Sequence, residues 1–117
     1  MVYFTVRCEA VPGKGTNLDQ FLATRSKPFW LSQTGVTGFH VYGDVLDGWP
    51  ERTLMIEVED LSSLQRILDS PERKQLRGEF MGYVARVESQ ITEQLISERA
   101  ESRASEPVAT SGGWEPD

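Results

Sequence analysis

The stretch GVTGFHVYGDVLDGWPERTLMIEVE, residues 35–59, decides the fold of this chain. Two runs in which apolar and polar residues alternate, 36–45 and 52–59, flank the breaker cluster Asp47-Gly48-Trp49-Pro50, and this pattern predicts two strands joined by a turn. Each run connects outward to a helical stretch, and each helical stretch leads to one more alternating run, at 2–11 and 83–92. The predicted order is therefore β-α-β, turn, β-α-β.

The first helical stretch is predicted to begin near Thr16 or Asn17, either of which is a suitable N-cap. Pro28 lacks a backbone donor and clashes with the preceding turn, so a kink or break is expected there. A second piece then carries Trp30 and ends before Gly35. The inner face is predicted from the helical spacing of Leu18, Phe21, Leu22, Arg25 and Phe29.

The second helical stretch is also predicted in two pieces. Asp60 is a cap for the first piece, and Ser70-Pro71-Glu72 is a new start signal with proline at the first helical position. The residues expected on the inner face are Leu61, Leu64, Ile67, Leu68, Leu76 and Phe80.

Right-handed crossovers leave room for one strand between two parallel ones. Two interleaved β-α-β units then give a four-stranded antiparallel sheet in the order 4-1-3-2, an α+β ferredoxin-like βαββαβ fold with two kinked helices on one face. The face toward the helices is predicted to be almost wholly apolar. It comprises Phe4, Val6, Cys8, Phe39, Val41, Leu54, Ile56, Val58, Ala85 and Val87.

The opposite face of the sheet mixes charged, aromatic and aliphatic residues. Such a face fits either exposure to solvent or a wet, ion-paired interface with another sheet. Its predicted members are Tyr3, Thr5, Arg7, Glu9, His40, Tyr42, Met55, Glu57, Val84, Arg86 and Glu88.

The predicted α+β domain covers residues 1–92, and residues 93–117 form a C-terminal extension. Residues 93–104 are expected to form a short helix anchored by Leu95 and Ile96. From Ser105 the composition is too polar to bury much, so the tail is expected to be flexible or docked on a partner. Trp114 stands alone in it, and either docks or is solvated.

Composition limits the classes of partner and compartment. The formal net charge of −6 argues against nucleic acid, because binding to phosphates needs clustered Lys and Arg. No apolar run approaches the roughly 18 residues that span a bilayer, and the N-terminus lacks a signal-peptide pattern. The single cysteine, Cys8, excludes an intramolecular disulfide and suits a reducing compartment. The expected location is the cytoplasm, with no membrane partner.

Several short segments carry a resemblance to a known family. They are Val11-Pro12-Gly13-Lys14, GVTGF at 35–39, DLSSL at 60–64 and LDSPE at 68–72. Together they resemble the dimeric α+β-barrel superfamily, and within it the antibiotic-biosynthesis-monooxygenase-like domains, over about residues 2–92. The resemblance implies a homodimer in which two sheets face each other to close a barrel. It also implies a small ligand between helices and sheet, and no cofactor in members that oxidise electron-rich aromatics.

The haem-degrading members of that superfamily carry an iron-binding histidine on the second helix, and residues 61–81 contain none. No metal is expected either, because one His and one Cys cannot supply the three or four ligands of a zinc site.

His40 is the only histidine and the candidate catalytic acid or base, with Tyr42 beside it as a candidate substrate-binding residue. The alternative for His40 is a half-buried interface residue hydrogen-bonded to a carboxylate. Phe29, Trp30, Phe80 and Tyr83 are candidates for an apolar ligand pocket, and the alternative for them is ordinary core packing.

Two functions remain open. The first is a small homodimeric α+β-barrel protein that acts as a cofactor-independent monooxygenase on a small apolar or aromatic molecule. The second is a non-catalytic homodimeric ligand-binding or stress-related domain. RNA binding through the sheet is excluded by the net negative charge of the chain. It is also excluded because RTLMIEVE, residues 52–59, lacks aromatic residues on which bases could stack.

Overall fold

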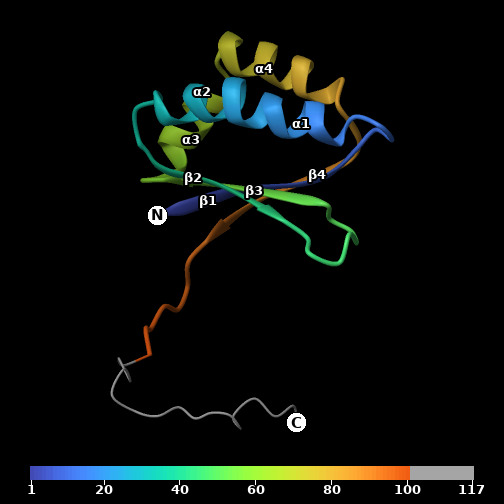
Figure 1. Cartoon of the computed structure of the whole chain (residues 1–117). Coiled ribbons are helices and arrows are strands. Elements are labelled where there is room, and N and C mark those ends of the chain that lie inside the picture. Colours follow the sequence, from blue (N-terminus) through green and yellow to red (C-terminus); the bar gives the residue numbers. More distant parts are fainter. Residues whose placement is uncertain (101–117) are drawn as a thin grey trace, which may run out of the picture.

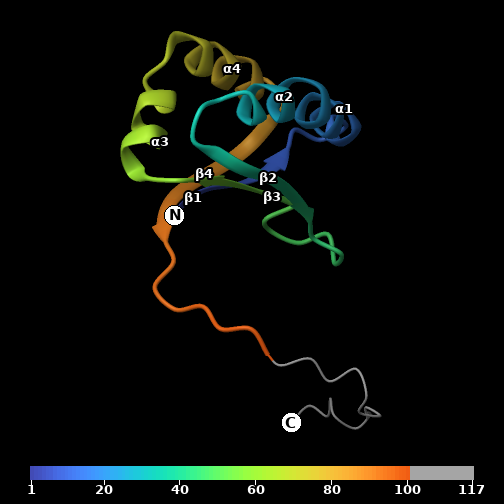
Figure 2. The ribbon, with the colours of Figure 1, turned by 90° about the vertical axis from the view of Figure 1, so that its left-hand side faces the viewer.

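The computed structural model describes residues 1–100, and within them the chain forms one sheet covered by helices on one face (Figures 1 and 2). The strands are β1 (Val2–Ala10), β2 (Val36–Gly43), β3 (Arg52–Val58) and β4 (Val84–Glu93). The sheet order is β2-β3-β1-β4, and every neighbouring pair is antiparallel. The predicted ferredoxin-like fold and strand order are confirmed.

The first helical stretch consists of α1 (Gly15–Phe21), η1 (Leu22–Ser26) and α2 (Lys27–Leu31), where η1 is a turn of π-helix. The predicted cap is wrong, because the helix begins at Gly15 and the preceding Lys14 makes no side-chain cap. The predicted break at Pro28 is replaced by this π turn, one of the known ways in which a helix accommodates a disturbed hydrogen-bond ladder.

The π turn also moves the inner face of this stretch by one residue. Leu22, Ser26 and Trp30 are buried at four-residue intervals, whereas Arg25 is exposed and Phe29 is only partly buried. The predicted stripe through Arg25 and Phe29 is therefore wrong, because a π turn holds more residues than the 3.6 of an α-helix.

The second helical stretch matches its predicted start signals. In α3 (Leu61–Leu68) the Asp60 carboxylate accepts a hydrogen bond from the Ser63 amide at 2.8 Å. In α4 (Pro71–Met81) the Ser70 hydroxyl accepts one from the Arg73 amide at 3.2 Å. Both caps satisfy amides that the first turn of a helix leaves without intrahelical partners.

The core lies between the helices and the sheet, and most predicted core residues are buried in it. One end of β4 differs from the predicted alternation. Ala10 pairs with Val84 and Glu9 with Arg86, so the register shifts and Ala85 is an extra residue in β4. Val84 is consequently buried and Ala85 exposed, the reverse of the prediction. A bulge turns side chains to the other face, which alternation alone does not reveal. Val41 also departs from the prediction, with 40% of its surface exposed.

After β4, residues 94–100 run away from the sheet without regular secondary structure (Figure 1). The predicted helix at 93–104 is thus wrong over this part, where Leu95 and Ile96 are exposed and have nothing to pack against. Residues 101–104 and the tail with Trp114 lie outside the described residues. Among residues 1–100, no helix is long and apolar enough to cross a membrane.

Candidate functional site

The candidate residues fall on two sides of the sheet. His40 and Tyr42 lie on β2 and face away from the helices, whereas Trp30 and Phe80 lie in the helical layer and are buried. Because side chains alternate along a strand, the sheet separates the two groups. They cannot form one site within a single chain.

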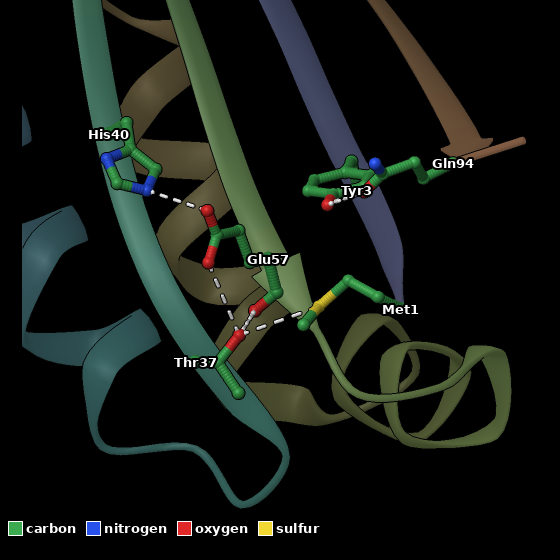
Figure 3. A network of polar contacts seen from close by, with 6 residues as sticks. All are labelled: Met1, Tyr3, Thr37, His40, Glu57 and Gln94. Carbon is green, nitrogen blue, oxygen red and sulfur yellow. Dashed lines mark hydrogen bonds and ion pairs between the residues drawn. The ribbon is translucent and has the colours of Figure 1, made fainter. Parts of the chain in front are cut away.

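On the open face of the sheet, His40 belongs to a small polar network (Figure 3). Its Nε2 lies 3.0 Å from Oε2 of Glu57, and the Thr37 hydroxyl donates to the backbone oxygen of Glu57 at 3.4 Å. The His40 ring stacks on Tyr42 at 6.3 Å between centroids. The His40 side chain is 41% exposed and lines neither of the two hollows described below. This geometry matches the alternative of a histidine paired with a carboxylate.

On the other side, a cavity of about 130 Å³ lies between the sheet and the helices, and we call it the aromatic cavity. Side chains from β1, β3, β4, η1, α2 and α4 line it. They are Phe4, Val6, Ser26, Trp30, Leu54, Ile56, Arg73, Leu76, Arg77, Phe80, Met81, Val87 and Ser89.

Aromatic rings form much of the wall of the cavity. The rings of Phe4 and Trp30 lie 5.8 Å apart at 42°, and the guanidinium carbon of Arg73 lies 5.6 Å from the Phe4 centroid. Such distances permit favourable ring–ring and cation–π contacts. The wall therefore offers both flat apolar surface and positive charge.

The sequence did not point to Arg73 and Arg77 as site residues. Arg73 is half-buried and Arg77 is exposed, and both line the cavity beside the buried Leu76 and Phe80, at helical spacings of three, four and seven residues along α4. Burial lowers the pKa of Arg73, and the charge of Arg77 lowers it further. An arginine at an inward position of an otherwise apolar stripe was the signal available in the sequence.

Ser26 is a second polar group that sequence reasoning missed, and the π turn explains why. The turn places Ser26 where it lines the cavity with only 3% of its surface exposed. Its hydroxyl makes no hydrogen bond within residues 1–100. Turns of π-helix often occur at functional sites.

Two of the four aromatic candidates for the pocket lie elsewhere. Phe29 packs edge-on against Trp30, with centroids 5.4 Å apart, and Tyr83 packs on Phe21 at 5.1 Å. Neither lines the aromatic cavity. They support the residues that do, Trp30 directly and Phe80 through Phe21.

A second hollow lies between the first helical stretch and β2, with a volume of about 470 Å³. It is larger but more open, and its Arg52 is already paired with Asp19, at 2.7 Å from Nε to Oδ1. Phe39 is its only aromatic residue. We place the candidate site in the aromatic cavity because, within residues 1–100, its Arg73 and Arg77 take part in no ion pair and the Ser26 hydroxyl in no hydrogen bond.

Cys8 is fully buried in the core, and this burial raises the pKa of its thiol to about 11. A thiol with such a pKa is a poor nucleophile at neutral pH. Within residues 1–100, no three His, Cys, Asp or Glu side chains lie close enough together to hold a metal ion.

Comparison with known proteins gives the fold. No family model and no curated protein matches the chain, but solved structures do. The chain is similar to SnoaB, a cofactor-independent oxygenase from Streptomyces nogalater, with a TM-score of 0.72 at 16% identity over 82% of this chain and 94% of that one. The chain is also similar to a candidate antibiotic biosynthesis monooxygenase from Deinococcus radiodurans, with a TM-score of 0.71 at 17% identity over 87% of this chain and 100% of that one.

A dabb family protein from Mesorhizobium loti, described as having a ferredoxin-like fold, gives a TM-score of 0.68 at 16% identity over 80% of this chain and 96% of that one. At these identities the likeness establishes the fold alone.

Proposed function

We propose that this chain, which has the ferredoxin-like fold of the antibiotic biosynthesis monooxygenase-like proteins, binds a small aromatic molecule in the aromatic cavity and oxygenates it without a cofactor. The observation that carries the proposal is the cavity of about 130 Å³ walled by Phe4, Trp30 and Phe80. An apolar cavity of roughly 150 Å³ is enough for one benzene ring.

The chain's own residues would bind and orient the substrate. Phe4 and Trp30 present ring surface, and the buried aliphatic residues of β1 and β3 exclude water. The lining contains no Asp, Glu, His, Lys, Tyr or Cys, so this site supplies no conventional base. The substrate would therefore have to be acidic and electron-rich itself.

The reaction balances with dioxygen as the oxidant. For an electron-rich phenol with a single ring, a ring C–H and the phenolic O–H are oxidised to a benzoquinone, and the substrate gives up four electrons. One oxygen atom becomes the new carbonyl, and the other leaves as water with the two hydrogens. Similarity of fold to SnoaB, described as a cofactor-independent oxygenase, supports this class of reaction.

The same proposal includes a homodimer formed through the open face of the sheet. The helices cover only one face (Figure 2), and the other face exposes Tyr42 at 53%. It also carries both signs of charge, since Arg7 lies opposite Glu88 in the β1–β4 register and Glu88 forms an ion pair with Arg86. A twofold axis brings such a self-complementary face against itself.

Oxygen uptake tests the enzymatic part. With wild-type protein and an electron-rich phenol with a single ring, we expect protein-dependent uptake of one O₂ per quinone formed. Trp30→Phe should slow it, because the smaller ring leaves the substrate loosely held. Trp49→Phe is the control, since Trp49 lies under the Arg86 guanidinium and lines no part of the cavity. If the rate of oxygen uptake with protein equals the rate without protein, the proposal that the chain is an oxygenase is contradicted.

The second candidate function is binding without turnover in the same cavity. The lack of a conventional base in the lining favours it. Saturable binding of aromatic ligands with no oxygen uptake from any electron-rich phenol would select this function over the first.

A further inference from the structure

We infer that the ligand of the aromatic cavity is an aromatic anion, whose delocalised oxyanion is bound by Arg73 and Arg77. A carboxylate and a phenolate-type oxygen share this chemistry. The inference rests on the proposed binding function and adds the charge of the ligand to it.

The first support is that these two arginines have no acidic partner among residues 1–100. The ion pairs within residues 1–100 join Arg25 to Glu79, His40 to Glu57, Arg52 to Asp19 and Arg86 to Glu88. Arg73 and Arg77 take part in none of them. In a chain with 18 acidic and 12 basic residues, carboxylates are in excess. Two unpaired arginines beside one cavity therefore leave positive charge for a ligand.

The second support is the position of Arg73 in the first turn of α4. Pro71 is the first helical residue, so Arg73 is the third. A cation is disfavoured at the positive end of the helix dipole, while an anion is favoured there. Helix stability thus gives no reason for an arginine at this position. An anion bound beside it would relieve both this repulsion and the repulsion from Arg77.

The third support is the direction in which Arg73 is held. Its guanidinium lies over the Phe4 ring, which also faces Trp30. Positive charge is thereby kept at the cavity wall rather than released to solvent. The planar fork of a guanidinium matches a carboxylate and is well suited to aromatic surroundings.

Ser26 gives an independent sign of a ligand. Ser26 is buried, with 3% of the residue's surface exposed, and it lines the same cavity, while its hydroxyl lacks a hydrogen-bond partner in the described part of the chain. A buried hydroxyl without a partner costs free energy. A polar atom of the ligand would satisfy it.

The test uses the full chain and small probes of matched size. Benzoate supplies a carboxylate, para-nitrophenol supplies a phenolate whose visible absorption reports its ionisation, and benzyl alcohol is neutral. Affinities are measured by calorimetry for the wild type, for Arg73→Gln, for Arg77→Gln and for the double variant. Lys74→Gln is the matched control, because it removes the same charge from the same helix outside the cavity.

We expect benzoate to bind the wild type about tenfold or more tightly than benzyl alcohol. The double variant should lose this preference while its benzyl alcohol affinity stays within about twofold. Lys74→Gln should keep the preference. Added salt should weaken the binding of benzoate more than that of benzyl alcohol, because salt screens the charge of partly exposed arginines. Bound para-nitrophenol should ionise at lower pH than free para-nitrophenol if a phenolate is accepted.

Equal affinity for benzoate and benzyl alcohol, or an unchanged preference in the double variant, would overturn the inference and leave the proposed binding function standing. Failure of every probe to bind would contradict the proposed function as well. A preference for benzoate without any shift in para-nitrophenol ionisation identifies the anion as a carboxylate.

Discussion

The guanidinium of Arg73 lies over the ring of Phe4, with its carbon 5.6 Å from the ring centroid. This contact joins the first turn of α4 to the first half of β1, on the helix-covered face of the sheet. It connects the charged part of the aromatic cavity with its aromatic part.

Phe4→Leu should weaken benzoate binding by about fivefold or more, because Arg73 loses the ring that holds its guanidinium at the cavity. The free energy of unfolding should fall by about 1–2 kcal/mol from the poorer packing. Calorimetry and urea unfolding measure the two effects.

Phe39→Leu is the control, since Phe39 packs against the same core from β2 but does not line the aromatic cavity. A similar loss of benzoate affinity in both variants would show that the effect is only one of packing.

His40→Ala should weaken the proposed homodimer and leave benzoate binding unchanged. The His40–Glu57 pair lies on the open face, on the other side of the sheet from the aromatic cavity. Removing one member of a hydrogen-bonded pair from an interface leaves the other without its partner. Sedimentation equilibrium should show a dimer dissociation constant raised by about tenfold.

Lys74→Ala, on the exposed surface of α4, is the control for this effect and should leave the dimer unchanged. A wild-type protein that is monomeric at micromolar concentration would remove the dimer from the account.

Cys8 makes stability depend on alkaline pH. Its pKa is about 11 in the folded protein and 9.0 without burial, so the unfolded chain releases this proton first. The stability from the protonated buried thiol is complete below pH 9.0 and is lost as pH rises towards about 11. Wild-type protein should lose up to about 2 kcal/mol more than Cys8→Ala across this interval.

Urea unfolding at several pH values measures the difference between the two proteins, which cancels the titration of tyrosines and lysines. Parallel pH profiles would show that Cys8 titrates normally in the fold.

Ser70→Ala should lower the free energy of unfolding by about 1 kcal/mol, because the Ser70 hydroxyl caps α4. Ser70→Asp should restore most of this stability, since aspartate also accepts the Arg73 amide. Thermal unfolding checks both variants. No change in Ser70→Ala would mean that water replaces the cap at no cost.

Much of the fold followed from the sequence because its signals are local. Alternation in β3 and the cap at Ser70 each depend on a few neighbouring residues, and both predictions are confirmed. The predictions of buried faces are wrong where the spacing between inward-facing residues changes by one residue. The π turn at Leu22–Ser26 and the extra residue Ala85 in β4 each shift the period, and neither leaves a distinct local signal.

The candidate site was harder to predict for the same reason. Trp30 and Phe80 were identified as pocket candidates from their aromatic rings, and both line the aromatic cavity. Ser26 depended on the π turn, so simple helical spacing missed it. Arg73 has the spacing of an inward residue, but charged residues on a helix are usually solvated, so spacing alone does not identify it as a site residue.

The measurement that tests the account most directly is the response of the Trp30 indole N–H signal in ¹H–¹⁵N spectra during titration with benzoate and with benzyl alcohol. Trp30→Phe and Trp49→Phe assign the signals. We predict a saturable shift for Trp30 and none for Trp49, although Trp49 also lies beside an arginine, with the Arg86 carbon 3.8 Å from its ring centroid. A Trp30 signal that neither probe moves would contradict the claim that the aromatic cavity binds a small aromatic molecule.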